Sequence, residues 1–225
     1  MRYYPIFMNL SGKSCLVVGA GQVGVRKIRT LLECGAGSVT VVDPAQPADG
    51  LRPLLSDPAL NYEQRSFHDA DVDGKWLVIA STSNEDVNWR ISNLCNDRGV
   101  LCNIVDQPEK CSFIVPATIT RGDLTLAVST GGQSPALAKK IRQDLESGFG
   151  DQYGAFLELM GRLRPLLLGL GRPTPENTAV FRAVVHSGLL DAMAARDTEL
   201  AGAILRELLP EGLHPNIPEL LHDLA

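Results

Sequence analysis

The sequence lacks the features that mark several large classes of protein. Its 225 residues contain no apolar run that approaches the length of a membrane span, and the region near Met1 has no signal-peptide pattern. The formal net charge of −5 argues against general nucleic-acid binding, which depends on clustered positive charge. We therefore expect a cytoplasmic protein that binds neither nucleic acid nor a membrane.

Cysteine and histidine are few, and neither is spaced as a set of metal ligands. The five cysteines include no C-x-x-C pair, and the four histidines are scattered along the chain. We therefore predict no metal site, and we interpret the cysteines as reduced core residues rather than as metal or redox groups. The cysteines are Cys15, Cys34, Cys95, Cys102 and Cys111.

A glycine pattern near the start of the chain is the most informative feature that is present. Gly19, Gly21 and Gly24 lie between an apolar strand at 15–18 and an amphipathic helix that ends at Gly35. In such a turn the first glycine permits the bend, the second lets the backbone approach a pyrophosphate, and the third lets the helix pack on the strand. A triplet of glycines alone could also be a packing turn in any α/β protein.

An acidic residue in register with the turn favours the dinucleotide interpretation. Asp43 ends the apolar run 38–42, about 20 residues after the last glycine, where a carboxylate can accept both ribose hydroxyls. Such a carboxylate disfavours the additional phosphate of NADP. The sequence therefore predicts NAD as the cofactor.

Two later strands are expected at 76–80 and 100–105, separated by a helix that Asn84 caps and Gly99 ends. Polar residues follow both strands, at 81–84 and at 103–106. Because ligands of open parallel sheets gather beyond the carboxyl ends of the strands, these tips and the glycine turn should surround one crevice. Asp106 at the last tip could take a proton during hydride transfer, although its spacing suits a plain turn residue equally well.

The pattern changes after this α/β region. Residues 112–120 and 124–129 have strand composition with a hairpin turn at 121–123, and a helix follows with Ser134 as cap and Pro135 in its first turn. The remainder is leucine-rich and helical. We predict an α/β fold: a Rossmann-type parallel-sheet domain over 1–112, a small α+β domain over 113–148 and a helical region over 149–225.

Several motifs in consistent order resemble the precorrin-2 dehydrogenase and sirohydrochlorin ferrochelatase family, the stand-alone counterpart of the N-terminal part of siroheme synthase. The resemblance covers roughly residues 1–150. The motifs are PIFMNL at 5–10, VVGAGQVGVRK at 17–27, CNIVD at 102–106, SFIVP at 112–116 and AVSTGGQSP at 127–135. The region after about residue 150 does not clearly match the family core.

The resemblance implies NAD-dependent oxidation of precorrin-2 to sirohydrochlorin, in a homodimer that exchanges structure through the domain at 113–148. Some members also insert Fe²⁺, so Fe²⁺ or Co²⁺ is a candidate substrate, and the residues leave open whether this chain does so. The residue that the family ties to catalysis corresponds to Asp106. Positions that correspond to its NAD contacts are Gln22, Val23, Asp43 and Pro44.

Further candidates follow from position alone. Thr82 and Asn103 lie at strand tips and are expected near the cofactor. A basic rim is expected because the tetrapyrrole carries many carboxylates, although exposed helix faces commonly carry such charges. The candidates for this rim are Arg26, Lys27, Arg29, Lys139, Lys140 and Arg142.

Two other functions fit part of the sequence. A non-catalytic NAD-sensing module would need the glycine turn and Asp43 but leaves the Asp106 tip and the later strand-hairpin-helix block unexplained. A dehydrogenase of small hydroxy acids commonly keeps a histidine as its acid or base, and no histidine lies near a predicted strand tip. Turnover of a tetrapyrrole would separate both from the main hypothesis.

Overall fold

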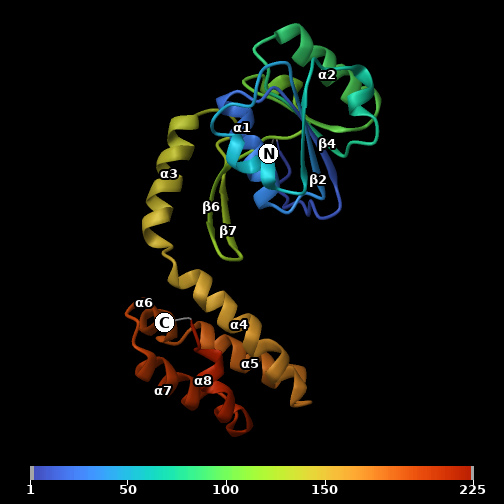
Figure 1. Cartoon of the computed structure of the whole chain (residues 1–225). Coiled ribbons are helices and arrows are strands. Elements are labelled where there is room, and N and C mark those ends of the chain that lie inside the picture. Colours follow the sequence, from blue (N-terminus) through green and yellow to red (C-terminus); the bar gives the residue numbers. More distant parts are fainter. Residues whose placement is uncertain (1–2, 224–225) are drawn as a thin grey trace. The chain divides into compact units, whose positions relative to one another are not determined.

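The computed structural model describes residues 3–223 and divides the chain into two compact units (Figure 1). The first unit ends at Val115 and the second begins at Pro116. This boundary is close to the predicted end of the α/β domain at 112. The predicted division of the second half at 148 stays a prediction.

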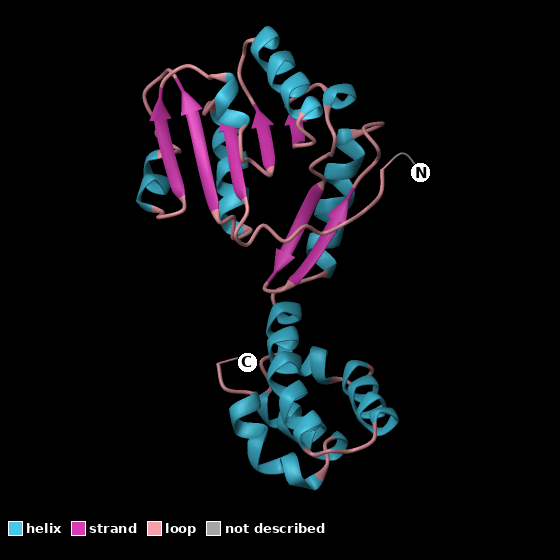
Figure 2. Cartoon of the chain, turned by 90° about the vertical axis from the view of Figure 1, so that its right-hand side faces the viewer, coloured by secondary structure: helices cyan, strands magenta, loops and turns pink. Residues whose placement is uncertain are grey.

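The first unit is built on a five-stranded parallel sheet (Figure 2). Its strands are β1 (Ser14–Val18), β2 (Ser38–Asp43), β3 (Leu60–Gln64), β4 (Leu77–Ala80) and β5 (Leu101–Ile104). Their spatial order is β3-β2-β1-β4-β5. β2 and β3 are added on one side of β1, and the chain then crosses to add β4 and β5 on the other side. This order is that of a Rossmann-type sheet and confirms the predicted fold class.

Helices cover both faces of the sheet because alternate strand residues point to opposite sides. Val17 of β1 packs in the same core as Ile28 of α1 (Gln22–Glu33). Leu16 packs on the other side with Ile91 of α2 (Glu85–Asp97). Short 3₁₀ turns complete the connections at η1 (Arg52–Ser56), η2 (Asp69–Val72) and η3 (Pro108–Lys110).

The predicted cap of α2 is confirmed, whereas the strand expected over 112–120 is wrong in its first part, 112–116. Asn84 Oδ1 accepts the Val87 N–H at 3.2 Å. The segment after Ser112 does not pair as a strand, and β6 begins only at Ala117. Ser112 contacts β5 at one residue: its N–H donates to the Cys102 carbonyl at 2.9 Å, and its hydroxyl accepts the Cys102 N–H at 2.7 Å.

All five cysteines are free, but they do not share one environment. Cys15, Cys95 and Cys102 are buried, as expected of core residues. The interpretation of Cys34 as a core residue is wrong, because this side chain is exposed at the C-cap of α1, where the chain turns at Gly35. Cys111 is half-buried and belongs to the loop after β5.

The second unit begins with the predicted hairpin. β6 (Ala117–Arg121) pairs antiparallel with β7 (Leu124–Val128), and Gly122 in the turn has φ +54°. α3 (Pro135–Gly148) packs on both strands, and the Ser134 hydroxyl caps it by accepting the Leu137 N–H at 3.2 Å. The sequence correctly placed this turn and this cap.

The rest of the second unit is helical, as predicted. Leu159, Leu163 and Leu167 form a stripe at four-residue spacing, fully buried against the later helices. These helices are α4 (Gln152–Gly169), α5 (Thr174–Val185), α6 (Leu189–Ala194), α7 (Thr198–Leu208) and α8 (Ile217–Leu220), with the 3₁₀ turn η4 (Glu211–Asn216) before α8. No helix within residues 3–223 has the length and apolar character needed to cross a membrane.

Two leucines on α7 provide a matched test of this helical core. Leu205 is fully buried, whereas the side chain of Leu200 is 48% exposed. We expect Leu205→Ala to lower the free energy of unfolding by about 2–5 kcal/mol, because it removes buried methyl groups and leaves a cavity. Leu200→Ala should change it by less than about 0.5 kcal/mol. Urea unfolding followed by circular dichroism measures both, and equal losses would contradict the assigned core.

Candidate active site

In the glycine turn between β1 and α1, close contacts leave no room for a side chain at the first and third glycines. Gly19 has φ +91°, and a Cβ atom there would lie 2.7 Å from the Ser81 carbonyl oxygen. A Cβ atom on Gly24 would overlap the Gly19 carbonyl oxygen. Gly21 differs, because a Cβ atom there would meet no atom within 4 Å. The first and third glycines therefore serve packing, while the second borders open space that a ligand can approach.

The N-terminus of α1 is suited to an anion. Its N-cap, Gly21, has no side chain to bind the free N–H groups of the first turn, and the first turn contains no acidic residue. By contrast, α2 is capped by Asn84 and carries Glu85 and Asp86 in its first turn. The uncapped N–H groups and the positive end of the α1 dipole can bind a phosphate.

Asp43 connects the end of β2 to this turn. Its Oδ2 accepts the Ala20 N–H at 2.6 Å, and its Oδ1 accepts the Ala45 N–H at 2.8 Å. Each carboxylate oxygen can accept a second hydrogen bond, so the half-buried group retains capacity for ribose hydroxyls. Pro44 follows it and is exposed. The backbone bonds fix the carboxylate beside the glycine turn.

Two further residues support this region: Tyr62, which the sequence did not identify, and Ser81, which belongs to the strand tip predicted at 81–84. The Tyr62 hydroxyl donates to the Ala45 carbonyl at 2.7 Å, and burial raises the pKa of Tyr62, with a further contribution from the charge of Asp43. The Ser81 hydroxyl donates to the Gly19 carbonyl at 2.7 Å. Tyr62 lies in an alternating pattern typical of a strand, which predicts its place in β3 but not its hydrogen bond. Nothing in the local sequence indicates the hydrogen bond between Ser81 and Gly19.

The strand register brings the predicted tips to one edge of the sheet. Val18 of β1 is opposite both Val42 of β2 and Ala80 of β4, and Ala80 is opposite Ile104 of β5. The four strands therefore end at the same level. The glycine turn, Asp43, the loop 81–84 and Asp106 all follow directly from these ends, as the sequence predicted.

Thr82 and Asn103 make bonds within the protein. The Thr82 hydroxyl lies 2.8 Å from Asn88 Oδ1, and the Asn88 amide donates to the Thr82 carbonyl at 3.0 Å. Asn103 is 8% exposed, and its amide donates to the Phe113 carbonyl at 3.0 Å. Both side chains hold loops at the edge of the site, and their contacts with a cofactor stay predictions.

Asp106 lies in a turn that a cysteine closes. It is exposed and has φ +63°, a left-handed conformation that is uncommon for residues other than glycine, asparagine and aspartate. The Ile104 N–H donates to the Cys111 sulfur at 3.1 Å, and the thiol lies 3.2 Å from the carbonyl oxygens of Ile104 and Gln107. These contacts fix both sides of the loop that presents the Asp106 carboxylate.

The basic residues predicted to meet the substrate have different surroundings. Lys27 on α1 is half-buried, and burial, followed by the charge of Arg26, lowers the pKa of its ammonium group. On α3, Lys140 and Arg142 already pair with Asp144 and Glu146 one turn further along. The remaining candidates are exposed: Arg26, Arg29 and Lys139. Contacts between any of the six and a substrate stay predictions.

Within residues 3–223 no group of three or more His, Cys, Asp or Glu side chains is arranged to hold a metal ion. The sheet order, the glycine turn and the fixed carboxylate at the end of β2 together define a Rossmann-type dinucleotide-binding domain.

Comparison with protein families also indicates a dinucleotide-binding domain and identifies a family. Residues 6–117 match the model described as "Putative NAD(P)-binding", and residues 121–148 match the one described as "Sirohaem biosynthesis protein central". The chain belongs to the sirohaem biosynthesis family that these two adjacent domains define.

Two curated relatives are both named siroheme synthase. The siroheme synthase of Thioalkalivibrio sulfidiphilus is 45% identical over 160 residues, which are 71% of this chain and 32% of that protein. The siroheme synthase of Pseudomonas fluorescens is 36% identical over 218 residues, 97% of this chain and 46% of that protein. The chain thus spans less than half the length of these relatives. The second match corrects the expectation that the region after residue 150 does not match the family, because the alignment covers 97% of this chain. Nothing in the sequence indicated this, since these helices contain regularly spaced leucines and no recognisable motif.

A solved structure shares the fold. The chain of "SirC, precorrin-2 dehydrogenase" aligns with a TM-score of 0.77 and 24% sequence identity over 92% of this chain and 98% of that one. The likeness therefore includes the parallel sheet, the hairpin and the C-terminal helices.

The contrast between two glycines tests the geometry of the turn. We expect Gly24→Ala to lower the free energy of unfolding by about 1–3 kcal/mol, because the new methyl group overlaps the Gly19 carbonyl oxygen and the helix must shift. Gly21→Ala should lower it by less than about 1 kcal/mol, since its Cβ atom enters open space at φ −67° and only the poorer N-cap preference of alanine is lost. Thermal unfolding of both variants is the measurement, and a Gly24→Ala protein as stable as Gly21→Ala would contradict the close contact.

Proposed function

We propose that the protein is an NAD-dependent dehydrogenase that oxidises precorrin-2 to sirohydrochlorin on the path to siroheme. The observation that carries this assignment is the exposed, left-handed Asp106, which the strand register puts at the same sheet edge as the glycine turn and Asp43. The sirohaem biosynthesis domain at 121–148 and the siroheme synthase relatives support the substrate.

The residues at the sheet edge fit a bound NAD. The open space beside Gly21 and the uncapped first turn of α1 suit the pyrophosphate, with Gln22 and Val23 supplying N–H groups. Asp43 would accept the ribose hydroxyls and repel the 2′-phosphate of NADP. When bound, the nicotinamide supplies the hydride acceptor.

Asp106 is suited to take the proton that leaves with the hydride. Within the described residues 3–223, no group hydrogen-bonds its carboxylate, so both oxygens can meet a C–H or pyrrole N–H proton of the substrate. The Cys111 contacts restrict the turn and limit the positions that the carboxylate can take. Asp106 is therefore the proposed catalytic residue.

The same site would serve metal insertion with Fe²⁺ or Co²⁺ as a substrate. Asp106 would then take pyrrole protons as the ion enters, and the macrocycle nitrogens would be its final ligands. We further propose a cytoplasmic homodimer that associates through the segment 113–148, which includes the hairpin.

Asp43 tests the cofactor assignment. We expect Asp43→Ala to weaken NAD binding roughly tenfold to a hundredfold, because charge-assisted hydrogen bonds to the ribose are lost, and to narrow the preference for NAD over NADP. Asp49→Ala is the matched control, since the Asp49 side chain in the same loop is 97% exposed. Fluorescence titration measures both dinucleotides, and an unchanged NAD affinity in Asp43→Ala would refute the ribose contact.

Asp106 tests the chemical step. We expect Asp106→Ala to reduce precorrin-2 oxidation by about a hundredfold to ten-thousandfold, the usual contribution of a positioned acid or base, while NAD affinity stays unchanged. The rate is measured anaerobically from the absorbance of sirohydrochlorin. Near-normal turnover would make Asp106 a turn residue only, whereas a loss of NAD binding would indicate a disturbed site rather than a lost proton acceptor.

A further inference from the structure

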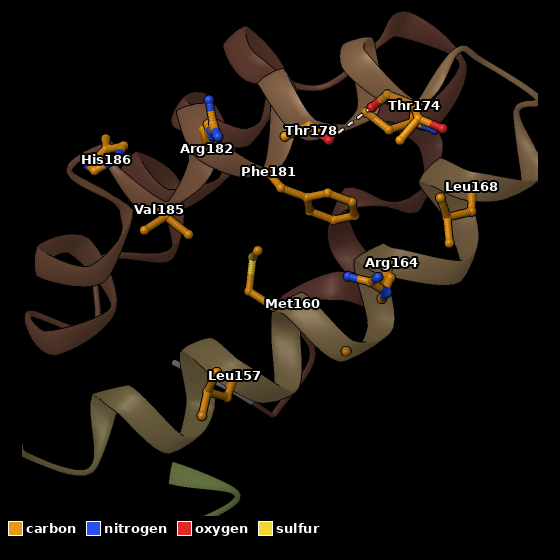
Figure 3. A pocket seen from close by; sticks show the side chains of 12 residues that line it. Leu157, Met160, Arg164, Leu168, Thr174, Thr178, Phe181, Arg182, Val185 and His186 are labelled. Atoms are coloured by element: carbon orange, nitrogen blue, oxygen red, sulfur yellow. Dashed lines mark hydrogen bonds between the residues drawn. The ribbon is translucent and has the colours of Figure 1, made fainter. Parts of the chain in front are cut away.

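A groove between α4 and α5 in the second unit has no role in the site described above. It has a volume of about 600 Å³, within the range of small-molecule sites. Met160 of α4 and Phe181 of α5 point into the space between the two helices (Figure 3). Apolar side chains at the edges of the groove are unusually exposed, 51% for Leu168 and 53% for Val185.

The ionisable side chains that line this groove are two arginines and one histidine. Arg164, Arg182 and His186 line it, and no Asp or Glu is among its described lining residues. The Arg164 guanidinium carbon lies 5.6 Å from the centre of the Phe181 ring, at the apolar floor. In a chain of net charge −5, this surface favours an anion that also has an apolar body.

Acidic residues on the same helices do not neutralise the groove. Glu158 on α4 pairs with Arg162 (N–O distance 2.6 Å), and Glu176 on α5 pairs with Arg172 (2.8 Å). Neither Arg164 nor Arg182 forms an ion pair within residues 3–223. Their charges are therefore available to an external partner.

One amide beside the groove has a buried oxygen without a partner within residues 3–223. Asn177 lines the groove but is only 5% exposed, and its Nδ2 donates to the Arg172 carbonyl at 3.2 Å. Its Oδ1 accepts no hydrogen bond within the described residues. A buried acceptor without a donor is uncommon in folded proteins.

We propose that the α4–α5 groove is a second binding site for a tetrapyrrole polycarboxylate, formed by residues other than those of the reaction site. The identity of this ligand rests on the proposed function. The macrocycle would lie against Met160 and Phe181, and its carboxylates would meet Arg164 and Arg182. Such a site would hold substrate or product at the protein surface outside the chemical step.

Charge reversal tests this site in the full chain. Uroporphyrin, a stable tetrapyrrole with acetate and propionate side chains, is titrated and followed by its absorbance. We expect Arg164→Glu/Arg182→Glu to bind one equivalent fewer per chain than the unaltered protein, or to bind the groove equivalent about tenfold more weakly. Arg206→Glu is the control, because Arg206 is exposed on α7 and does not line the groove. Circular dichroism should show all variants to be folded.

The outcomes separate this site from the proposed reaction. Loss of one equivalent of uroporphyrin from the double variant, together with normal NAD-dependent oxidation of precorrin-2, would support the groove site. The same loss of uroporphyrin binding, with no oxidation by the unaltered protein or any variant, would refute only the proposed dehydrogenase. Unchanged uroporphyrin binding in the double variant would overturn the groove site. Equally tight binding of the cationic tetrakis(N-methylpyridyl)porphyrin to the groove would also overturn it. A changed oligomeric mass with unchanged uroporphyrin binding would make the groove a protein interface instead.

Discussion

The close approach of the glycine turn to the neighbouring strand end is the constraint on which the site depends. Gly19 and Gly24 let β1, α1 and the Ser81 loop meet at distances that exclude any side chain. This contact brings the first turn of α1 to the edge of the sheet. Asp43 then closes the other side of the turn through the Ala20 N–H. If NAD binds as proposed, the positions of its pyrophosphate and ribose are set by these contacts before the ligand arrives.

The proposed catalytic residue lies at the same edge and is positioned in a different way. Asp106 follows the end of β5, and its position depends on a loop that the Cys111 thiol ties to Ile104 and Gln107. The end of β5 therefore fixes where the loop begins, and the Cys111 contacts hold the backbone on both sides of Asp106. This division suits an enzyme in which one part binds a conserved cofactor shape and another meets a large substrate.

The sequence predicted those features that have local signals. The glycine spacing, the caps at Asn84 and Ser134 and the hairpin turn at 121–123 each depend on residues close together in the chain. Contacts between distant residues were not predictable in this way. Ser112 contacts Cys102 of β5 through its backbone and its hydroxyl, and the groove cations lie on two helices of the region that was predicted only as leucine-rich and helical. Local composition holds no information about such pairings.

Anaerobic incubation of the purified protein with precorrin-2 tests the central assignment most directly. We expect sirohydrochlorin to form at a rate proportional to protein when NAD is present, to form much more slowly with NADP, and to stay at the protein-free level without a dinucleotide. NAD binding without any oxidation above the protein-free control would contradict the dehydrogenase and favour an NAD-sensing role for the sheet edge.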